Sequence, residues 1–237
     1  MSFYSTFADY YESVFPFKQA TFDFLESHLR GDNPRILDVG CGTGLYTARF
    51  AEAGVDATGI DLDTEMIRYA EMHYRNASFF RMNMTEAGTL DGGVSLAYSI
   101  GNVVSHLSRD QLPSFLDSLS EVLLAGGHWV FQIVNWDFIM KQAEYEFPVK
   151  SIDGGKMEFF REYTHISDTT VTFKTTLRSD DKVVFDEESV LHPITSEDYI
   201  SLHHNAGYRL TSHYCDYNLT AYEPDFDKAN IMVFQKE

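Results

Sequence analysis

The sequence predicts a doubly wound α/β protein with a mostly parallel seven-stranded sheet and a small antiparallel sheet inserted into it. Three observations predict this class. Short apolar segments alternate with helical segments over roughly the first 140 residues. A glycine-rich turn follows the first of these apolar segments. Beyond residue 141 the alternation gives way to consecutive segments that are rich in Thr, Val, Phe and Tyr.

The first part of the chain supplies five predicted strands and four predicted helices. The helices have apolar residues near the 3.6-residue period, and Gly31, Gly54 and Gly126 mark the ends of three of them. The strands are short apolar runs, as expected for a parallel sheet that is covered on both faces. In chain order, the predicted elements are helix 17–29, strand 35–39, helix 45–53, strand 55–60, helix 64–75, strands 77–82 and 94–99, helix 110–124 and strand 128–134.

Residues 142–194 predict an antiparallel meander that caps the substrate side of the domain. Its three strands are expected at 157–165, 169–178 and 183–192. A helix at 196–206, with Ser196 as its N-cap, and strands at 208–217 and 229–235 complete the chain. We therefore expect residues 1–237 to form a single domain with this insertion.

The charge and the apolar segments restrict the partners and the location. Eighteen Lys and Arg residues against 36 Asp and Glu residues give a formal net charge of −18, which disfavours a nucleic-acid partner. The first residues lack the basic start and apolar run of a secretory signal, and no apolar stretch approaches the roughly 20 residues that span a membrane. Two cysteines do not indicate a disulfide framework. These features predict a cytoplasmic protein without a membrane partner.

The glycine turn at residues 40–44 lies between the first strand and the second helix. Such a turn allows a ligand to approach the backbone closely. The dinucleotide pattern G-x-G-x-x-G fails here, because its last glycine would fall on Leu45 or Thr47. Asp38, just before the turn, would repel a pyrophosphate and attract a cationic amino group.

A second acidic residue, Asp61, ends the next predicted strand about 20 residues beyond the turn. A carboxylate at this place can accept hydrogen bonds from both ribose hydroxyls. The two acidic residues and the turn together indicate a nucleoside with a zwitterionic tail and no phosphate. S-adenosylmethionine has these properties, so we expect it as the cofactor.

Several segments together resemble the class I S-adenosylmethionine-dependent methyltransferases, which implies a Rossmann-like fold. Residues 36–44 resemble the first motif of that family, and residues 59–62 are similar to its ribose-binding motif. Residues 82–84 lie where the family often places an acid beside the adenine, although Asn83 replaces the acid here. The resemblance covers about residues 10–134, including the turn at 125–130. It implies cofactor contacts from Asp38, Gly40, Cys41, Gly42, Gly44, Asp61, Leu62, Asn83, Met84 and Ile100.

A narrower resemblance concerns the segments that follow strands four and five. Residues 100–107 and 134–139 are similar to the corresponding stretches of the glycine and sarcosine N-methyltransferases. The inserted sheet and the Tyr-Glu-Pro sequence at 222–224 also fit that group. This resemblance implies a small-molecule methyl acceptor, with an amine nitrogen as the methylated atom.

Five side chains are candidates for the acceptor side of the site. Asn102 and His106 follow strand four and Asn135 follows strand five, where ligands bind in open α/β sheets. Tyr10 and Tyr11 would close over the site as a lid, although aromatic core packing is an alternative for both. An amine must be uncharged to attack a methyl group, so a base such as His106 would assist.

Other functions remain open at this point. One alternative is an enzyme that acts on a tRNA or a protein, and another is a protein that binds S-adenosylmethionine without transferring its methyl group. A nicotinamide oxidoreductase is disfavoured by the glycine spacing. No His, Cys, Asp or Glu cluster has the spacing of metal ligands, so no metal is expected. The oligomeric state is undetermined, and a homodimer joined through the inserted sheet is compatible with the pattern.

Overall fold

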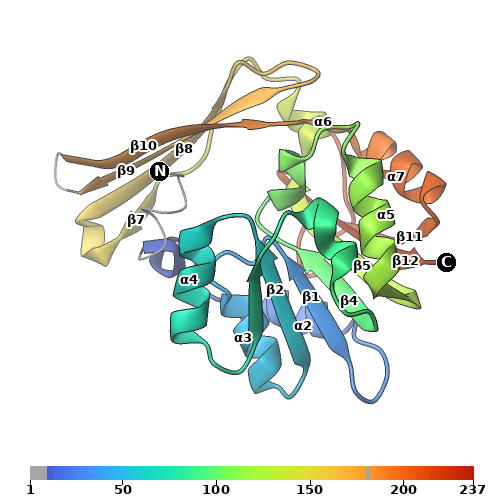
Figure 1. Cartoon of the computed structure of the whole chain (residues 1–237). Helices are drawn as coiled ribbons and strands as arrows, with labels where there is room; N and C mark the ends of the chain where they lie inside the picture. Colours follow the sequence, from blue (N-terminus) through green and yellow to red (C-terminus); the bar gives the residue numbers. More distant parts are fainter. Residues whose placement is uncertain (1–9, 180–181) are drawn as a thin grey trace.

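The computed structural model describes residues 10–179 and 182–237 and contains a seven-stranded main sheet (Figure 1). Its strand order is β11-β12-β5-β4-β1-β2-β3. Strands β1 to β5 pair in parallel, whereas β12 runs antiparallel to β5 and to β11. The predicted mostly parallel, doubly wound sheet is therefore confirmed. The strands are β1 (Arg35–Val39), β2 (Asp56–Asp61), β3 (Ser78–Arg81), β4 (Val94–Ser99), β5 (Leu123–Val134), β11 (Tyr208–Tyr214) and β12 (Ala229–Lys236).

Helices cover both faces of this sheet because consecutive strand residues point to opposite faces. On β5, Trp129 and Phe131 belong to the core that contains α5, whereas Val130 belongs to the core that contains Phe22 of α2 and Phe50 of α3. Residues 10–14 are also helical. The helices are α2 (Gln19–Glu26), α3 (Leu45–Glu52), α4 (Thr64–His73), α5 (Leu112–Val122), α6 (Trp136–Ile139) and α7 (Ser196–Asn205), with short 3₁₀ turns η1 (Met84–Thr89) and η2 (Val103–His106).

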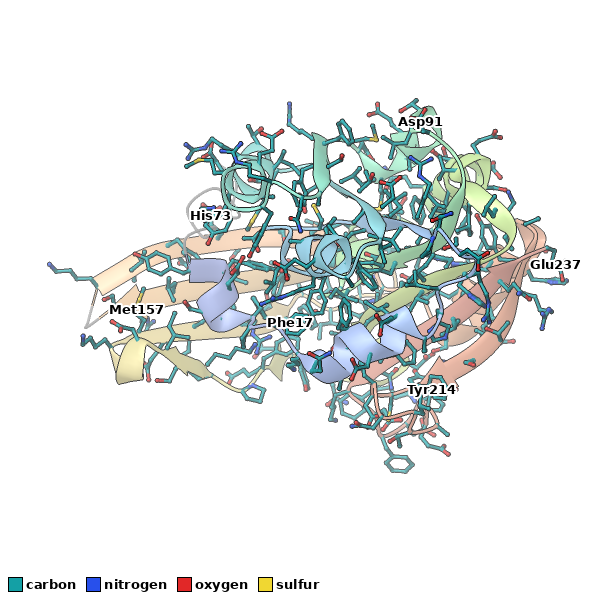
Figure 2. All side chains as sticks on the ribbon, turned by 90° about the horizontal axis from the view of Figure 1, so that it is seen from below. Phe17, His73, Asp91, Met157, Tyr214 and Glu237 are labelled. Carbon is teal, nitrogen blue, oxygen red and sulfur yellow. The ribbon has the colours of Figure 1, made fainter. Side chains whose placement is uncertain are left out.

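The insertion is a separate antiparallel sheet that extends away from the main sheet (Figure 1). Seen from below, its end near Met157 lies on the opposite side of the molecule from Glu237 (Figure 2). It has five strands in place of the three predicted, because β6 and β7 are too short to show an alternating pattern. Its elements are β6 (Tyr145–Glu146), β7 (Lys150–Ile152), η3 (Asp153–Gly155), β8 (Met157–Thr164), β9 (Val171–Ser179) and β10 (Lys182–Leu191).

Two details differ from the sequence prediction. Strand β5 begins directly after α5 and absorbs the glycines at 126 and 127, which form an irregular stretch of its pairing with β4. Thr195, not Ser196, is the N-cap of α7, and its hydroxyl accepts a hydrogen bond from the Asp198 N–H (3.1 Å). On the inner side of α7, His203 is fully buried, and its Nε2 accepts a hydrogen bond from the Trp129 indole (3.1 Å).

Within residues 10–179 and 182–237, none of the helices has the length and apolar character needed to cross a membrane.

Candidate active site

The glycine turn after β1 is shaped by backbone conformations that favour glycine. Gly40, Gly42 and Gly44 all have positive φ angles. A Cβ atom on Gly40 would lie 2.4 Å from the Val103 side chain, and one on Gly44 would lie 2.5 Å from the Phe79 ring. The turn therefore packs tightly against neighbouring elements at both ends and has a fixed shape.

The N–H groups of Gly40, Cys41 and Gly42 in this turn are already engaged within the protein. Those of Gly40 and Cys41 donate to the carbonyl of Ile60 at 2.8 and 3.0 Å. The Gly42 N–H donates to a carboxylate oxygen of Asp61 (2.9 Å). A phosphate group at a glycine turn depends on free N–H donors. The turn therefore suits a ligand without phosphate, in agreement with the sequence prediction.

Asp61 connects the turn with the helix that follows β2. Its second carboxylate oxygen accepts a hydrogen bond from the Asp63 N–H (2.9 Å), while the first is bound by Gly42. A carboxylate can accept about four hydrogen bonds, so both oxygens retain capacity for a ligand. Burial raises the pKa of Asp61, and the two backbone N–H bonds oppose this rise.

A cavity of about 660 Å³ lies beyond the carboxyl ends of β1, β2, β3 and β4. This position includes the switch point between β1 and β4, where open α/β sheets bind ligands. Eight of the predicted site residues line it, namely Tyr11, Gly40, Gly42, Asp61, Leu62, Asn83, Met84 and His106. The sequence analysis missed the other eight, which are Ile60, Asp63, Thr64, Glu65, Arg81, Met82, Gly101 and Val103.

The missed residues carried a positional signal. All eight lie within four residues of a predicted site residue, at the ends of strands or in the turns that follow them. Asp63 is also the N-cap of α4 and accepts hydrogen bonds from the N–H groups of Glu65 (2.9 Å) and Met66 (3.1 Å). The sequence thus predicts where the cavity lies better than it predicts which side chains line it.

Asp38 lies beneath the glycine turn and is absent from the cavity lining. It is almost fully buried, and one carboxylate oxygen accepts hydrogen bonds from Thr47 (2.7 Å) and Tyr98 (3.0 Å). Burial raises its pKa to about 7, and nearby Asp61 contributes to the rise. Asp38 therefore supports the turn from beneath and does not line the cavity.

Asn83 and Met84 form the wall beyond β3. The Asn83 side-chain oxygen caps η1 by accepting hydrogen bonds from the N–H (3.1 Å) and the hydroxyl (3.0 Å) of Thr85. This arrangement orients the amide of Asn83, whose NH₂ group is available to an adenine edge. Arg81 lies beside them and donates to the Leu62 carbonyl (3.2 Å).

Two predicted cofactor residues lie behind the wall. Cys41 packs against Gly59 in a small apolar cluster, and burial raises the pKa of its thiol well above the ordinary value. A thiol that remains protonated is a poor nucleophile. Ile100 packs partly buried against the core on the α2 and α3 face.

Asn135 has its hydrogen-bonding capacity filled by the protein. Its NH₂ group donates to the carbonyls of Pro224 (2.8 Å) and Asp227 (3.0 Å). Its oxygen accepts from the Phe138 N–H (3.2 Å) and from the Tyr222 hydroxyl (2.5 Å). Because the residue is also fully buried, the structure gives it a role in fixing the chain before β12.

Asn102 joins the loop after β4 to both sheets. Its oxygen accepts hydrogen bonds from the Val134 N–H (3.0 Å) and the Ser105 hydroxyl (2.8 Å). Its NH₂ group donates to the Tyr163 hydroxyl of the insertion (3.2 Å). Asn102 itself does not line the cavity, but its neighbours Gly101 and Val103 do.

His106 and Tyr11 line the cavity from two different segments, the 3₁₀ turn η2 and the N-terminal helical residues 10–14. His106 ends η2, and burial together with the nearby charge of His192 lowers its pKa, so its ring is neutral near pH 7. The Tyr11 ring lies 3.6 Å from the place of a Cβ on Gly42. Tyr10 packs partly buried against the core of the insertion and does not line the cavity.

Residues 36–127 match the model of a family described as a methyltransferase domain. The matched segment of the chain is therefore a methyltransferase domain. Within the described residues, no group of three or more His, Cys, Asp or Glu side chains is arranged to hold a metal ion.

Curated relatives match part of the chain, and solved structures share its fold. A ubiquinone biosynthesis O-methyltransferase of Paraburkholderia phymatum is 29% identical over 110 residues, which cover 46% of this chain and 47% of that protein. The chain spans about half the length of the curated relatives it matches. In the crystal structure of an S-adenosylmethionine-dependent methyltransferase from Clostridium acetobutylicum, the fold matches with a TM-score of 0.81 at 18% identity, over 99% of both chains. The S-adenosylmethionine-bound structure of CalS10, an amino pentose methyltransferase from Micromonospora echinaspora, matches with a TM-score of 0.69 at 17% identity, over 100% of this chain and 92% of that one.

Proposed function

We propose that this protein transfers the methyl group of S-adenosylmethionine to an amine nitrogen of a small-molecule acceptor. The observation that carries the proposal is the cavity at the carboxyl ends of the parallel strands. It combines a glycine turn whose N–H groups are engaged, the Asp61 carboxylate and the Asn83–Met84 wall in one space. Its volume of about 660 Å³ lies within the usual range for small-ligand sites.

The residues of this cavity fit S-adenosylmethionine. Asp61 would accept the ribose hydroxyls, and Met82, Asn83 and Met84 would border the adenine. Gly42 lines the cavity without a side chain, so its backbone can approach the amino-acid tail closely. Asp38 and Asp61 favour the two positive charges of this ligand. When bound, S-adenosylmethionine supplies a methyl group activated by its positively charged sulfur.

Support for a small acceptor comes from charge and from the elements around the cavity. The formal net charge of −18 opposes binding of a tRNA. Tyr11 from the N-terminal helix borders the cavity, and Tyr163 of the insertion contacts the loop that borders it. Such walls limit the size of the acceptor and keep water away from the reacting atoms.

Support for an amine comes from the neutral His106 ring. An amine nitrogen that gains a methyl group must lose a proton, and a ring nitrogen of His106 would accept it. Among known proteins, CalS10 is described as an amino pentose methyltransferase, whereas the relative from Paraburkholderia is described as an O-methyltransferase. An assay with amine and hydroxyl acceptors therefore tests whether nitrogen or oxygen is methylated.

The test begins with calorimetry of the purified protein with S-adenosylmethionine and S-adenosylhomocysteine, for which we expect binding of both. Release of S-adenosylhomocysteine is then measured with amines, amino acids, amino sugars and hydroxylated aromatics. Turnover with amines supports the proposal, and turnover confined to hydroxylated aromatics replaces it with O-methylation. Tight tRNA binding at physiological salt would indicate a macromolecular substrate. Cofactor binding without turnover of any acceptor would indicate a sensor.

A further inference from the structure

Residues 10–15, named the strap here, lie between α4 and the inserted sheet (Figure 1). The Phe15 N–H donates to the Tyr11 carbonyl (2.7 Å), which closes a helical turn within the strap. Tyr11 lines the cavity, and its ring lies 3.6 Å from the place of a Cβ on Gly42. The strap therefore supplies a wall of the cavity from outside the main sheet.

The inserted sheet holds one side of the strap by apolar packing. Val14 is almost fully buried in the same core as Ile152 of β7 and Phe159 of β8. The Phe15 ring meets the Phe159 ring edge-on, with centroids 5.9 Å apart. The Lys150 ammonium lies 4.0 Å from the centroid of Phe15 and donates to the Val14 carbonyl (2.8 Å). Several buried groups thus anchor this side of the strap.

The other side of the strap is tied to α4 by a hydrogen bond to a charged group. Tyr74, directly after α4, donates its hydroxyl to the Glu12 carboxylate (2.8 Å) in a half-buried position. Burial and the Glu12 carboxylate raise the pKa of Tyr74, so its hydroxyl keeps the proton and remains the donor. Hydrogen bonds to an ionised acceptor are stronger than those between neutral groups.

The Tyr74 ring is held by the apolar cluster that also supports the glycine turn. It packs on a small cluster that contains Phe79, and a Cβ on Gly44 would lie 2.5 Å from the Phe79 ring. This cluster therefore contacts one end of the turn, whereas Tyr11 lies near its middle. The hydrogen bond from Tyr74 to Glu12 joins these two contacts.

We propose that Glu12 and Tyr74 are positioning residues whose hydrogen bond holds Tyr11 at the cavity and slows the release of the cofactor. The inference rests on the proposed function for the identity of the ligand, and it does not depend on the acceptor atom. Because buried groups anchor the other side of the strap, opening of the cavity at Tyr11 should begin with the loss of this bond. Segments of this kind commonly control ligand release.

The first experiment measures how fast S-adenosylhomocysteine leaves the full-length protein, by surface plasmon resonance. Tyr74→Phe removes the hydroxyl and keeps the ring in its apolar cluster. We expect its dissociation rate constant to rise about tenfold, as the loss of a hydrogen bond to a charged group implies, with a smaller change in the association rate constant. An unchanged dissociation rate constant would overturn the proposal.

Further variants separate the hydrogen bond from a general loosening of the chain. Tyr46→Phe is the matched control, because the Tyr46 hydroxyl accepts from the Lys18 N–H (3.1 Å), outside the strap, and Tyr46 does not line the cavity. It should release the ligand at the wild-type rate. Glu12→Gln combined with Tyr74→Phe should be no faster than Tyr74→Phe alone, since the bond is already lost. Effects that multiply, or an equally fast Tyr46→Phe, would contradict the proposal.

Hydrogen exchange measured by mass spectrometry tests the strap without any ligand. The Phe15 amide is bonded to the Tyr11 carbonyl, so its protection reports the closed helical turn. Peptides that cover residues 10–15 should exchange about tenfold faster in Tyr74→Phe than in the wild type, and Tyr46→Phe should match the wild type. Equal exchange in all three proteins would overturn the proposal. If the wild type fails to bind S-adenosylhomocysteine, the proposed function fails, whereas this comparison still decides whether the bond holds the strap.

Discussion

The main sheet and the inserted sheet place their charged side chains in opposite ways. In the main sheet, β4 is buried at all six positions, and the acidic residue of the ligand site, Asp61, stands at the end of β2. In the inserted sheet, the cation Arg161 occupies the middle of a strand, between the buried residues Phe159 and Tyr163.

The two sheets therefore use different positions for their polar groups. The main sheet presents the residues that line the cavity from the ends of its strands and the turns that follow, whereas Asp38, inside β1, is buried beneath the turn and does not line the cavity. The inserted sheet packs through the face of β8 and carries a polar group on that same face. The cavity at the main sheet therefore depends on turn geometry, whereas the face of β8 shows how a charged side chain is held within an apolar row.

The largest effect is expected from breaking the glycine turn with Gly44→Ala. The new Cβ would need a positive φ angle and would lie 2.5 Å from the Phe79 ring. We expect a loss of about 3 kcal/mol in the free energy of unfolding, measured by urea denaturation. Gly54→Ala is the control, since Gly54 has a φ angle of +86° but open space around it, and should lose only about 1 kcal/mol. Equal losses would show that packing on Phe79 is unimportant.

The second prediction tests whether His106 acts as a general base. We expect His106→Gln to lower kcat about 100-fold, as loss of a general base does. In the wild type, activity should rise as pH increases through a value below 6.5, because the pKa of His106 is lowered, and this limb should vanish in the variant. His204→Gln, on the exposed side of α7, is the control. An unchanged pH profile would remove His106 from the mechanism.

Asp61→Ala tests the strand-end site of the main sheet directly. Loss of charge-assisted hydrogen bonds should weaken S-adenosylmethionine binding by roughly 1.5–3 kcal/mol, or about 10- to 150-fold in Kd by calorimetry. Asp56→Ala removes a carboxylate from the other end of β2, where Asp56 pairs with Arg35 at the surface. That control should bind normally, and similar weakening in both variants would argue against a ribose contact.

The titration of Asp38 predicts a pH dependence. Its pKa of about 7 in the folded protein exceeds the ordinary value of 3.8, so the folded state holds this proton more tightly. The contribution of Asp38 to stability should therefore fall as pH rises from about 4 to about 7. Cationic S-adenosylmethionine favours the ionised form, so its affinity should rise up to about tenfold between pH 6 and pH 8. Asp38→Asn lacks this titration, so its affinity measured by calorimetry should change less with pH. If the affinity of the variant changes as steeply as that of the wild type, another group causes the pH dependence.

The smallest effect concerns the return of the chain from the insertion to the main sheet. Thr195→Ala removes the N-cap of α7 and should cost about 1 kcal/mol of unfolding free energy by thermal denaturation. Thr195→Ser keeps the hydroxyl and should retain most of the stability. If both variants lose the same amount, the methyl group of Thr195 matters more than its cap.

The sequence was most informative where structure depends on neighbouring residues. The glycines at 40, 42 and 44 follow an apolar strand, and their positive φ angles meet a local requirement of the turn. Asp61 ends the adjacent parallel strand, so its proximity to the turn follows from the βαβ connection. These local rules predicted the main sheet and half of the residues that line the cavity.

Only the tertiary structure decided how the remaining polar groups are used. Asn135 follows β5 as predicted, but its hydrogen bonds go to carbonyls about 90 residues further along the chain. Asp38 turns toward Tyr98 on β4 and lies under the turn. The cations Lys150 and Arg161 come together only because β7 pairs with β8 and Phe15 packs beneath both. Such contacts depend on long-range packing, which the local pattern of residues does not specify.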